Sequence, residues 1–488
     1  AMWIPRQKQQ LLTIFFLVFF IQVPVNIAES SDIRLPKLGD ATSGIVSHEQ
    51  EYLIGRTWLK AFRSRIKEYQ DPILKQYLEQ LLNNLASHSQ LEDPRLELVI
   101  VNNPTINAFA VPGGIIGVHT GIFIHAKTED ELSSILAHEL AHLSQRHFAR
   151  GIEAQRKTSL LSMGGLLAGL AIAAAAGADA GTAAMTVSQA AAMEGSLRYS
   201  RSNEQEADRI GLQTMRAANR NPRAAAKMFE TMLSISRHSI NRPPEFLLTH
   251  PVTEKRIADA RNRTMNAPLK HYPPSEEYLL MQSRASVALN KNPDRIIQNF
   301  ELKLRQRALN SDAISYGLAL AYIKKNDFPK ARRLTNTLIE NHPEQLIYRY
   351  TDIEIDIASK HHDKAANKLQ ILLQKNPNSY PLLVLQAELF LNRKQYYESS
   401  EVLSLLTKDR PEDPDMWYRL AEVSGLAGDI ATVHKARAEY FILVGAFDRA
   451  RKQLSRAAVL LKHDFQQSAI IRQRLRDLAS IEERVIKL

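Results

Sequence analysis

The sequence predicts an α+β fold that is mostly helical, in which a domain with a small β-sheet precedes an all-α solenoid of repeats. Two short runs rich in β-branched residues, at 96–101 and 115–118, interrupt an otherwise helical pattern in the first half. In the second half, Pro343, Pro377 and Pro411 recur every 34 residues, the spacing of a stacked helical repeat. We therefore expect three segments: a signal peptide at 1–30, a first domain at 31–267 and a repeat domain at 268–488.

The composition is that of a globular protein with a basic balance. The 488 residues carry a formal charge of +11, and the pI is about 9.5. Lysine and arginine are scattered among acidic residues and no nucleic-acid motif is present, so we expect no nucleic-acid partner. Peripheral contact with an anionic membrane surface is the more natural use of this charge. The absence of cysteine excludes disulfides and cysteine-ligated metals.

The N-terminal segment predicts secretion. Arg6 and Lys8 precede an apolar run at 11–21, which is short for a membrane span but suits the core of a signal peptide. Small residues near Ala28 offer cleavage positions. We therefore expect a cleaved signal peptide and a secreted protein, with an uncleaved anchor as the alternative.

Two helices are expected within residues 47–87, the second starting at Asp71-Pro72, because proline is favoured in a first helical turn. The strand at 96–101 follows. Residues 107–110 then lead through Pro112-Gly113-Gly114 into the strand at 115–118. A plain β-hairpin without a binding role is the alternative interpretation of these two segments.

The next helix carries the most informative motif, His138-Glu139-x-x-His142. Residues four apart lie on one face of a helix, so the two imidazoles can bind a single Zn²⁺. Glu139 lies beside them and is placed to take a proton from a metal-bound water. Thr128 and Glu131 predict a capping box at the helix start. An amphipathic helix with two surface histidines is the alternative interpretation.

A catalytic zinc requires three protein ligands and an open position. His147 projects about 140° around a continuous helix from His142, so we expect a surface residue rather than a ligand. On a later helix, Glu204 and Asp208 are one turn apart and share a face. Glu204 can ligate, while Asp208 bonds the second ring nitrogen of a ligating histidine. Glu206 is expected to point elsewhere into solvent; a merely charged helix face is the alternative.

The zinc motif followed by Ser-Arg-x-x-Glu-x-x-Ala-Asp at 200–208 resembles the gluzincin family that contains HtpX and the CAAX prenyl proteases. The soluble members with a tetratricopeptide tail are more similar still, and the segments at 106–114 and 249–256 match them too. The resemblance implies a zinc endopeptidase with one Zn²⁺ per chain. It also implies a sheet edge that pairs with an extended substrate through main-chain hydrogen bonds. The residues of that edge are Asn107, Ala108, Phe109 and Ala110.

The resemblance also implies that a loop returns His250 to the cleft. One role is to occupy the fourth position of the metal and keep the enzyme latent. Another is to help Arg256 stabilise the oxyanion of the tetrahedral intermediate. A histidine that only packs the loop is the alternative.

Residues 160–178 carry no charge, but they are rich in alanine and glycine rather than in large apolar residues. We expect a soluble helix pair or a lid beside the site, with possible membrane contact. A transmembrane helix, as in HtpX-like relatives, is the rival interpretation.

From about residue 268 the pattern is that of tetratricopeptide repeats, which stack into one solenoid with a concave partner surface. The second repeat departs from the pattern at Asp356 and His362, and a turn and helix near Gly445 look out of register. A weaker repeat is expected around Ala285, and a non-repeat helical bundle is the alternative. The first clear repeat has the expected small, aromatic and turn residues at Ala319, Tyr322, Phe328, Ala331 and Pro343.

The resemblance implies a periplasmic role in the assembly and quality control of outer-membrane β-barrel proteins, with chaperone-like activity. Unfolded or misassembled barrel proteins would be the substrates, and the tetratricopeptide domain would contact the barrel-assembly machinery. Two alternatives stay open: an integral-membrane HtpX-like protease, and a non-proteolytic tetratricopeptide scaffold with a structural zinc site.

Overall fold

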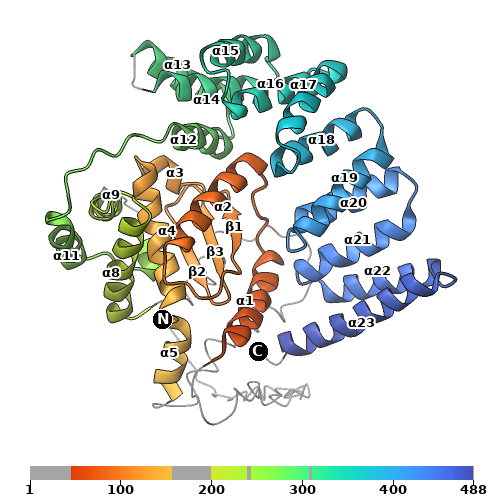
Figure 1. Cartoon of the computed structure of the whole chain (residues 1–488), viewed down its shortest axis with the longest axis horizontal. Helices are drawn as coiled ribbons and strands as arrows, with labels where there is room; N and C mark the ends of the chain where they lie inside the picture. The colour runs from red at the N-terminus through yellow and green to blue at the C-terminus, as the bar shows by residue number, and fades with distance from the viewer. Residues whose placement is uncertain (1–45, 157–198, 239–242, 307–309, 487–488) are drawn as a thin grey trace, which may run out of the picture. The chain divides into compact units, whose positions relative to one another are not determined.

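A computed structural model describes residues 46–156, 199–238, 243–306 and 310–486 (Figure 1). The predicted signal peptide and the uncharged segment at 160–178 lie outside these residues. Among the helices that are described, none combines the length and apolarity needed to cross a bilayer.

The first two helices form where the sequence predicts them. Helix α1, His48–Arg63, begins with a capping box between Ser47 and Gln50. Helix α2, Pro72–Ser87, is capped by Asp71, whose carboxylate accepts the first free amide groups of the helix.

The sheet has three strands, β1 (Glu97–Val101), β2 (Ala108–Val111) and β3 (Ile115–His119), in the order β1-β3-β2. Strand β3 is parallel to β1 and antiparallel to β2, so β2 and β3 form a hairpin within the predicted small sheet and β2 is an edge strand. Its turn needs glycine at Gly113 and Gly114, where φ is +81° and +82°.

Helices α3 (Ile122–His125) and α4 (Glu129–Ser144) follow the sheet, and α4 packs against β2. Thr128 caps α4 as predicted, but the capping box is incomplete, because the Glu131 side chain accepts from the Lys127 amide instead of the Thr128 amide. The chain continues through α5 (His147–Arg156), α8 (Arg201–Ala217), α9 (Ala224–His238), α10 (Phe246–Thr249) and α11 (Glu254–Met265).

Helix α8 lies close against α4 because Gly211 faces it. A Cβ atom at Gly211 would stand 3.2 Å from the backbone nitrogen of His138. This approach sets the carboxylates of α8 opposite the histidines of α4.

The repeat half consists of helical pairs stacked in chain order, which run from green to blue in Figure 1. This confirms the predicted architecture, including the weak first repeat around Ala285. The helix near Gly445 was wrongly predicted to be out of register: α20 and α22 begin about one repeat length apart. The helices are α12 (Glu276–Leu289), α13 (Pro293–Arg305), α14 (Ser311–Lys324), α15 (Phe328–Asn341), α16 (Leu346–Ala358), α17 (His362–Lys375), α18 (Tyr380–Asn392), α19 (Tyr396–Asp409), α20 (Pro414–Leu426), α21 (Ile430–Leu443), α22 (Phe447–Leu460) and α23 (Phe465–Ile486).

The unusual residue Asp356 in the second repeat is buried but paired. Its carboxylate accepts from Arg332 at 2.5 Å and from Lys368 at 2.6 Å. The same two cations contact Asp352, so two helices flanking α16 neutralise its acidic residues. A charge at a normally apolar position is therefore tolerated.

The solenoid packs against the sheet-containing part of the chain. Helix α18 contacts α2, and α21 contacts α1. Lys75 and Asp413 form an ion pair at 2.8 Å with both side chains buried. Arg410 donates two hydrogen bonds to the carboxylate of Glu79. One apolar core continues across this contact.

Because the Lys75–Asp413 pair is buried, we expect Asp413→Asn to reduce the free energy of unfolding by about 3–5 kcal/mol at neutral pH. The substitution keeps a side chain able to cap α20 but leaves the Lys75 ammonium without its counter-charge. The control Asp415→Asn alters a more exposed pair with Arg419, and should cost about 0.2–1 kcal/mol.

The stabilisation by the Lys75–Asp413 pair should depend on pH. Burial alone would raise the pKa of Asp413, but the Lys75 ammonium and neighbouring arginines lower it below its usual value. The stabilisation is therefore present above the unfolded-state pKa, about 3.9, and is lost as the pH falls through the lower folded pKa. Urea unfolding of the wild type and of Asp413→Asn, from neutral pH down to below the folded-state pKa, measures this stabilisation. Equal losses for Asp413→Asn and Asp415→Asn at neutral pH would contradict the prediction.

Candidate metal centre

Four buried side chains converge at one point between α4, α8 and the end of α10. His138 and His142 come from α4, Glu204 from α8, and His250 follows α10 directly. Each offers one ligand atom, and these atoms all lie within 4.8 Å of one another. The sequence placed the first three together by motif spacing, and the fourth by resemblance.

The first three groups point their ligand atoms at each other. The Nε2 atoms of His138 and His142 are 3.0 Å apart. The carboxylate oxygens of Glu204 lie 3.4 Å from His138 Nε2 and 3.3 Å from His142 Nε2. Two imidazoles and one carboxylate are the donor set of a common catalytic zinc site, so the residues fit a small divalent cation.

The electrostatics of the cluster also favour a cation. Burial lowers the pKa of His142 well below its usual value, which leaves a neutral ring able to ligate. Burial would also lower the pKa of His138, but the carboxylates of Asp208 and Glu204 raise it to about 9. The two carboxylates thus favour positive charge at His138, and a bound cation would supply that charge.

Asp208 lies at the second ring nitrogen of His138, as predicted. Its Oδ1 is 3.0 Å from His138 Nδ1. Arg256 donates to both oxygens of Asp208 at 2.7 Å and reaches Glu204 Oε2 at 3.0 Å. The guanidinium of Arg256 is thus turned toward these two carboxylates, an arrangement that the sequence did not indicate.

Glu139 is fully buried beside the cluster. Burial raises the pKa of its carboxyl above the usual value, and the nearby His250, His138 and the Ala110 amide offset this only in part. His250 Nε2 lies 3.5 Å from Glu139 Oε1, and His250 Nδ1 lies 2.9 Å from Glu204 Oε1. His250 therefore stands between the base and the third ligand.

Glu206 points away from Glu204 and Asp208, as expected, and is partly exposed, with its carboxylate 3.1 Å from His147 Nε2. The expectation for His147 was wrong. It was expected at the surface, but it is buried, with its Nδ1 atom 2.9 Å from His142 Nδ1. The reason is that α4 ends at Ser144 and Arg146 takes a φ of +51°, so a projection along one continuous helix does not apply.

The edge strand β2 runs beside α4, and its side chains belong to the core. The Phe109 ring packs on Trp58 and Phe62, with centroids 5.7 and 5.8 Å away, and occupies the space that a side chain at Gly117 would need. Asn107 precedes the strand and accepts from the His119 amide. Any segment that pairs with β2 would therefore be held through its main chain.

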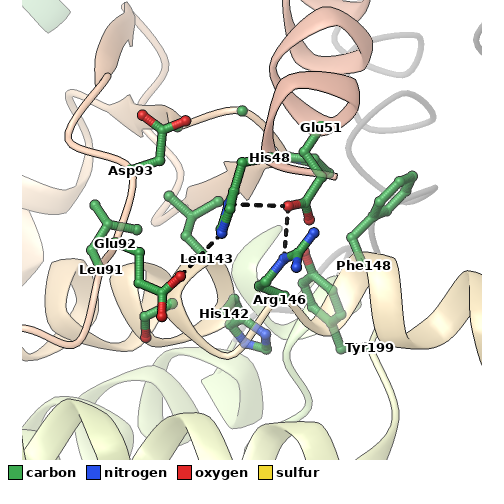
Figure 2. A pocket seen from close by; sticks show the side chains of 14 residues that line it. His48, Glu51, Leu91, Glu92, Asp93, His142, Leu143, Arg146, Phe148 and Tyr199 are labelled. Atoms are coloured by element: carbon green, nitrogen blue, oxygen red, sulfur yellow. Dashed lines mark hydrogen bonds and ion pairs between the residues drawn. The ribbon is translucent and has the colours of Figure 1, made fainter. Parts of the chain in front are cut away.

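A pocket reaches the metal centre at His142 (Figure 2). The Tyr199 ring stacks on the imidazole of His142 with centroids 4.0 Å apart and planes 18° from parallel. Glu51, which also lines the pocket, lies 2.9 Å from Arg146 and 3.7 Å from His48. Sequence reasoning missed Tyr199, although it stands directly before the 200–208 motif.

Comparison with known proteins decides the family. The model of peptidase family M48 matches residues 72–264, and a tetratricopeptide repeat model matches residues 356–423. The chain is 31% identical over 480 residues to the β-barrel assembly-enhancing protease of Escherichia coli (strain K12), covering 98% of each chain. The chain belongs to the β-barrel assembly-enhancing protease family.

Other relatives match a shorter stretch of the chain. The mitochondrial metalloendopeptidase OMA1 of Schizosaccharomyces pombe is 32% identical over 203 residues, which cover 40% of this chain and 57% of that protein. The predictions of a metallopeptidase and of a tetratricopeptide domain are thus confirmed. The chain is a metal-dependent peptidase of family M48 with a domain suited to protein–protein interaction.

Proposed function

We propose that the metal is Zn²⁺, one per chain, and that His138, His142 and Glu204 bind it. The observation that carries this proposal is the convergence of two imidazoles and a carboxylate in one buried cluster. When bound, the metal would polarise the scissile carbonyl and lower the pKa of a water molecule. The donor set leaves a fourth position, which catalysis requires.

In this proposal Glu139 is the general base and then the general acid. Its carboxylate accepts a proton from the attacking water and passes it to the amine that leaves the substrate. Burial supports the role, because it raises the pKa of Glu139 toward the working pH and strengthens its proton affinity.

Asp208 and Arg256 act as positioning residues in the proposal. Asp208 would fix the ring of His138 through Nδ1, and Arg256 would hold the carboxylates of Asp208 and Glu204 in place. This replaces the earlier hypothesis that Arg256 stabilises the oxyanion, since its Nε and both terminal nitrogens contact protein oxygens.

For His250 we propose that it occupies the fourth position and keeps the resting enzyme latent. Support comes from its buried place in the ligand cluster and from its contact with Glu204. An oxyanion role remains the second candidate, because the same imidazole is also close to Glu139.

His250→Ala separates these two roles. If His250 blocks the metal, casein cleavage should rise about tenfold, because a larger fraction of the enzyme is competent. If His250 stabilises the oxyanion, cleavage should instead fall about 10²–10³-fold. The double variant His250→Ala/Glu139→Gln is the control, since any gain that survives in it comes from a contaminating protease.

We propose that extended substrates add to the sheet at β2, at residues 107–110. The edge position of β2 beside α4 supports this, because a paired segment would run past the metal centre. Main-chain pairing would accept many sequences, which suits the quality control of unfolded proteins.

The relatives are named for β-barrel assembly, and the sequence predicts a signal peptide at 1–30, a peptidase domain at 31–267 and a repeat domain at 268–488. From these two observations we infer a role in the periplasm. Misassembled outer-membrane β-barrel proteins would be the substrates, and the solenoid would bind the assembly machinery. Carbonate extraction of membranes tests this location. A periplasmic protein is released, whereas the rival integral-membrane protease stays in the pellet.

A further inference from the structure

Both histidines of the metal cluster use their Nε2 atoms toward the centre, so their Nδ1 atoms face the surrounding protein. His138 meets a carboxylate directly, because Asp208 Oδ1 is 3.0 Å from its Nδ1 atom. No carboxylate contacts His142 Nδ1 among the described residues. His147 stands there instead, with its own Nδ1 atom 2.9 Å away.

We propose that His147 and Glu206 form a hydrogen-bonded relay that orients His142 for metal binding, as Asp208 does for His138. The proposal rests on the proposed metal site. It adds two positioning residues, neither of which touches the metal or the substrate.

The direction of each hydrogen bond follows from the ligand chemistry. A ligating Nε2 atom carries no proton, so a neutral His142 has its proton on Nδ1 and donates it to His147 Nδ1. His147 then has its own proton on Nε2, which faces Glu206 Oε2 at 3.1 Å. One carboxylate therefore fixes the tautomers of two rings in sequence.

Arg150 holds the carboxylate of Glu206 from the solvent side. Its Nη1 atom donates to Glu206 Oε2 at 2.8 Å, although its side chain is half exposed. This parallels the pairing of Arg256 with Asp208 on the other side. Helix α8 thus presents Glu204 to the cluster and Glu206 and Asp208 to the outer sides of the two histidines.

The backbone explains why His147 is needed between His142 and Glu206. Glu206 lies two residues from Glu204 and Asp208, so it points away from their shared face and does not reach His142 itself. The break at Arg146, with φ +51°, turns the chain so that His147 lies buried between them. His147 bridges the gap that a straight α4 would leave.

The test measures Zn²⁺ affinity of the full chain by competition with a chelator. His147→Ala and Glu206→Ala should each weaken binding about 10–100-fold, the usual effect of losing an outer partner of a ligating histidine. His147→Asn should recover most of the loss, because its Oδ1 atom can accept from His142 Nδ1. Gln205→Ala, an exposed neighbour on α8, should leave affinity unchanged.

Two further readouts separate positioning from general stability. The melting temperature of the metal-free protein should stay close to wild type in Glu206→Ala, whose side chain is only partly buried. The visible spectrum of the Co²⁺-substituted protein should change in His147→Ala and return in His147→Asn, because it reports the geometry at the metal. A merely structural role would not produce this pattern.

Wild-type affinity in both folded alanine variants would overturn the relay. If His147→Ala does not fold, Glu206→Ala alone decides. Wild-type Zn²⁺ affinity in that variant would show that the Glu206 carboxylate does not help to orient His142. Failure of the wild-type chain to bind Zn²⁺ would instead contradict the proposed metal site.

Discussion

Glu139→Gln should reduce casein cleavage by about 10²–10⁴-fold while the zinc content stays at that of the wild type. The amide has nearly the same shape as the carboxylate but cannot accept a proton from water at neutral pH. Glu139 is buried beside the metal-binding cluster but does not belong to the group of residues whose ligand atoms converge there. Metal binding should therefore survive the substitution. Cleavage assays and metal analysis on the same preparations measure both quantities.

A matched control is available on the same helix. Glu131 is also a buried glutamate of α4, but its carboxylate accepts from the Lys127 amide at the far end of the helix. Glu131→Gln keeps that acceptor and should leave activity within about twofold of the wild type, since no proton transfer involves it. Near-normal cleavage by Glu139→Gln would assign the proton transfer to another group.

Glu204→Ala should remove both metal and activity. The substitution deletes one of three proposed ligands and leaves His138 and His142 without the carboxylate that lies between them. Zinc affinity should fall by more than the roughly 10–100-fold expected for an outer partner. Chelator competition and cleavage assays measure the two losses.

The control for this variant is Gln205→Ala, the exposed neighbour on α8. It should keep full zinc content and activity, because its side chain faces away from the cluster. Retention of one zinc per chain by Glu204→Ala would show that another group is the third ligand.

Sequence patterns predicted those features that depend on local spacing. The i,i+4 relation brought His138 and His142 onto one face of α4, and Ser47, Asp71 and Thr128 marked helix starts. The 34-residue repeat predicted the solenoid, because each helical pair repeats the same packing positions.

The features that were missed depend on backbone breaks or on distant contacts. One residue with positive φ, Arg146, was enough to bring His147 to the metal cluster, and nothing in a 3.6-residue period shows such a break. The Lys75–Asp413 pair joins residues 338 positions apart, so no local pattern indicates it. Arg256 was placed at the site by resemblance alone, whereas its pairing with Asp208 required the fold.

The most direct test of the metal-dependent mechanism is the cleavage of casein by one preparation of His250→Ala in three states: as purified, stripped by a chelator, and refilled with one equivalent of Zn²⁺. This variant removes any latency due to His250. We expect cleavage to disappear when the metal is removed and to return when it is restored, while Glu139→Gln in the same background takes up zinc and stays inactive. Undiminished cleavage by the stripped protein, or a folded chain that binds no zinc, would contradict it.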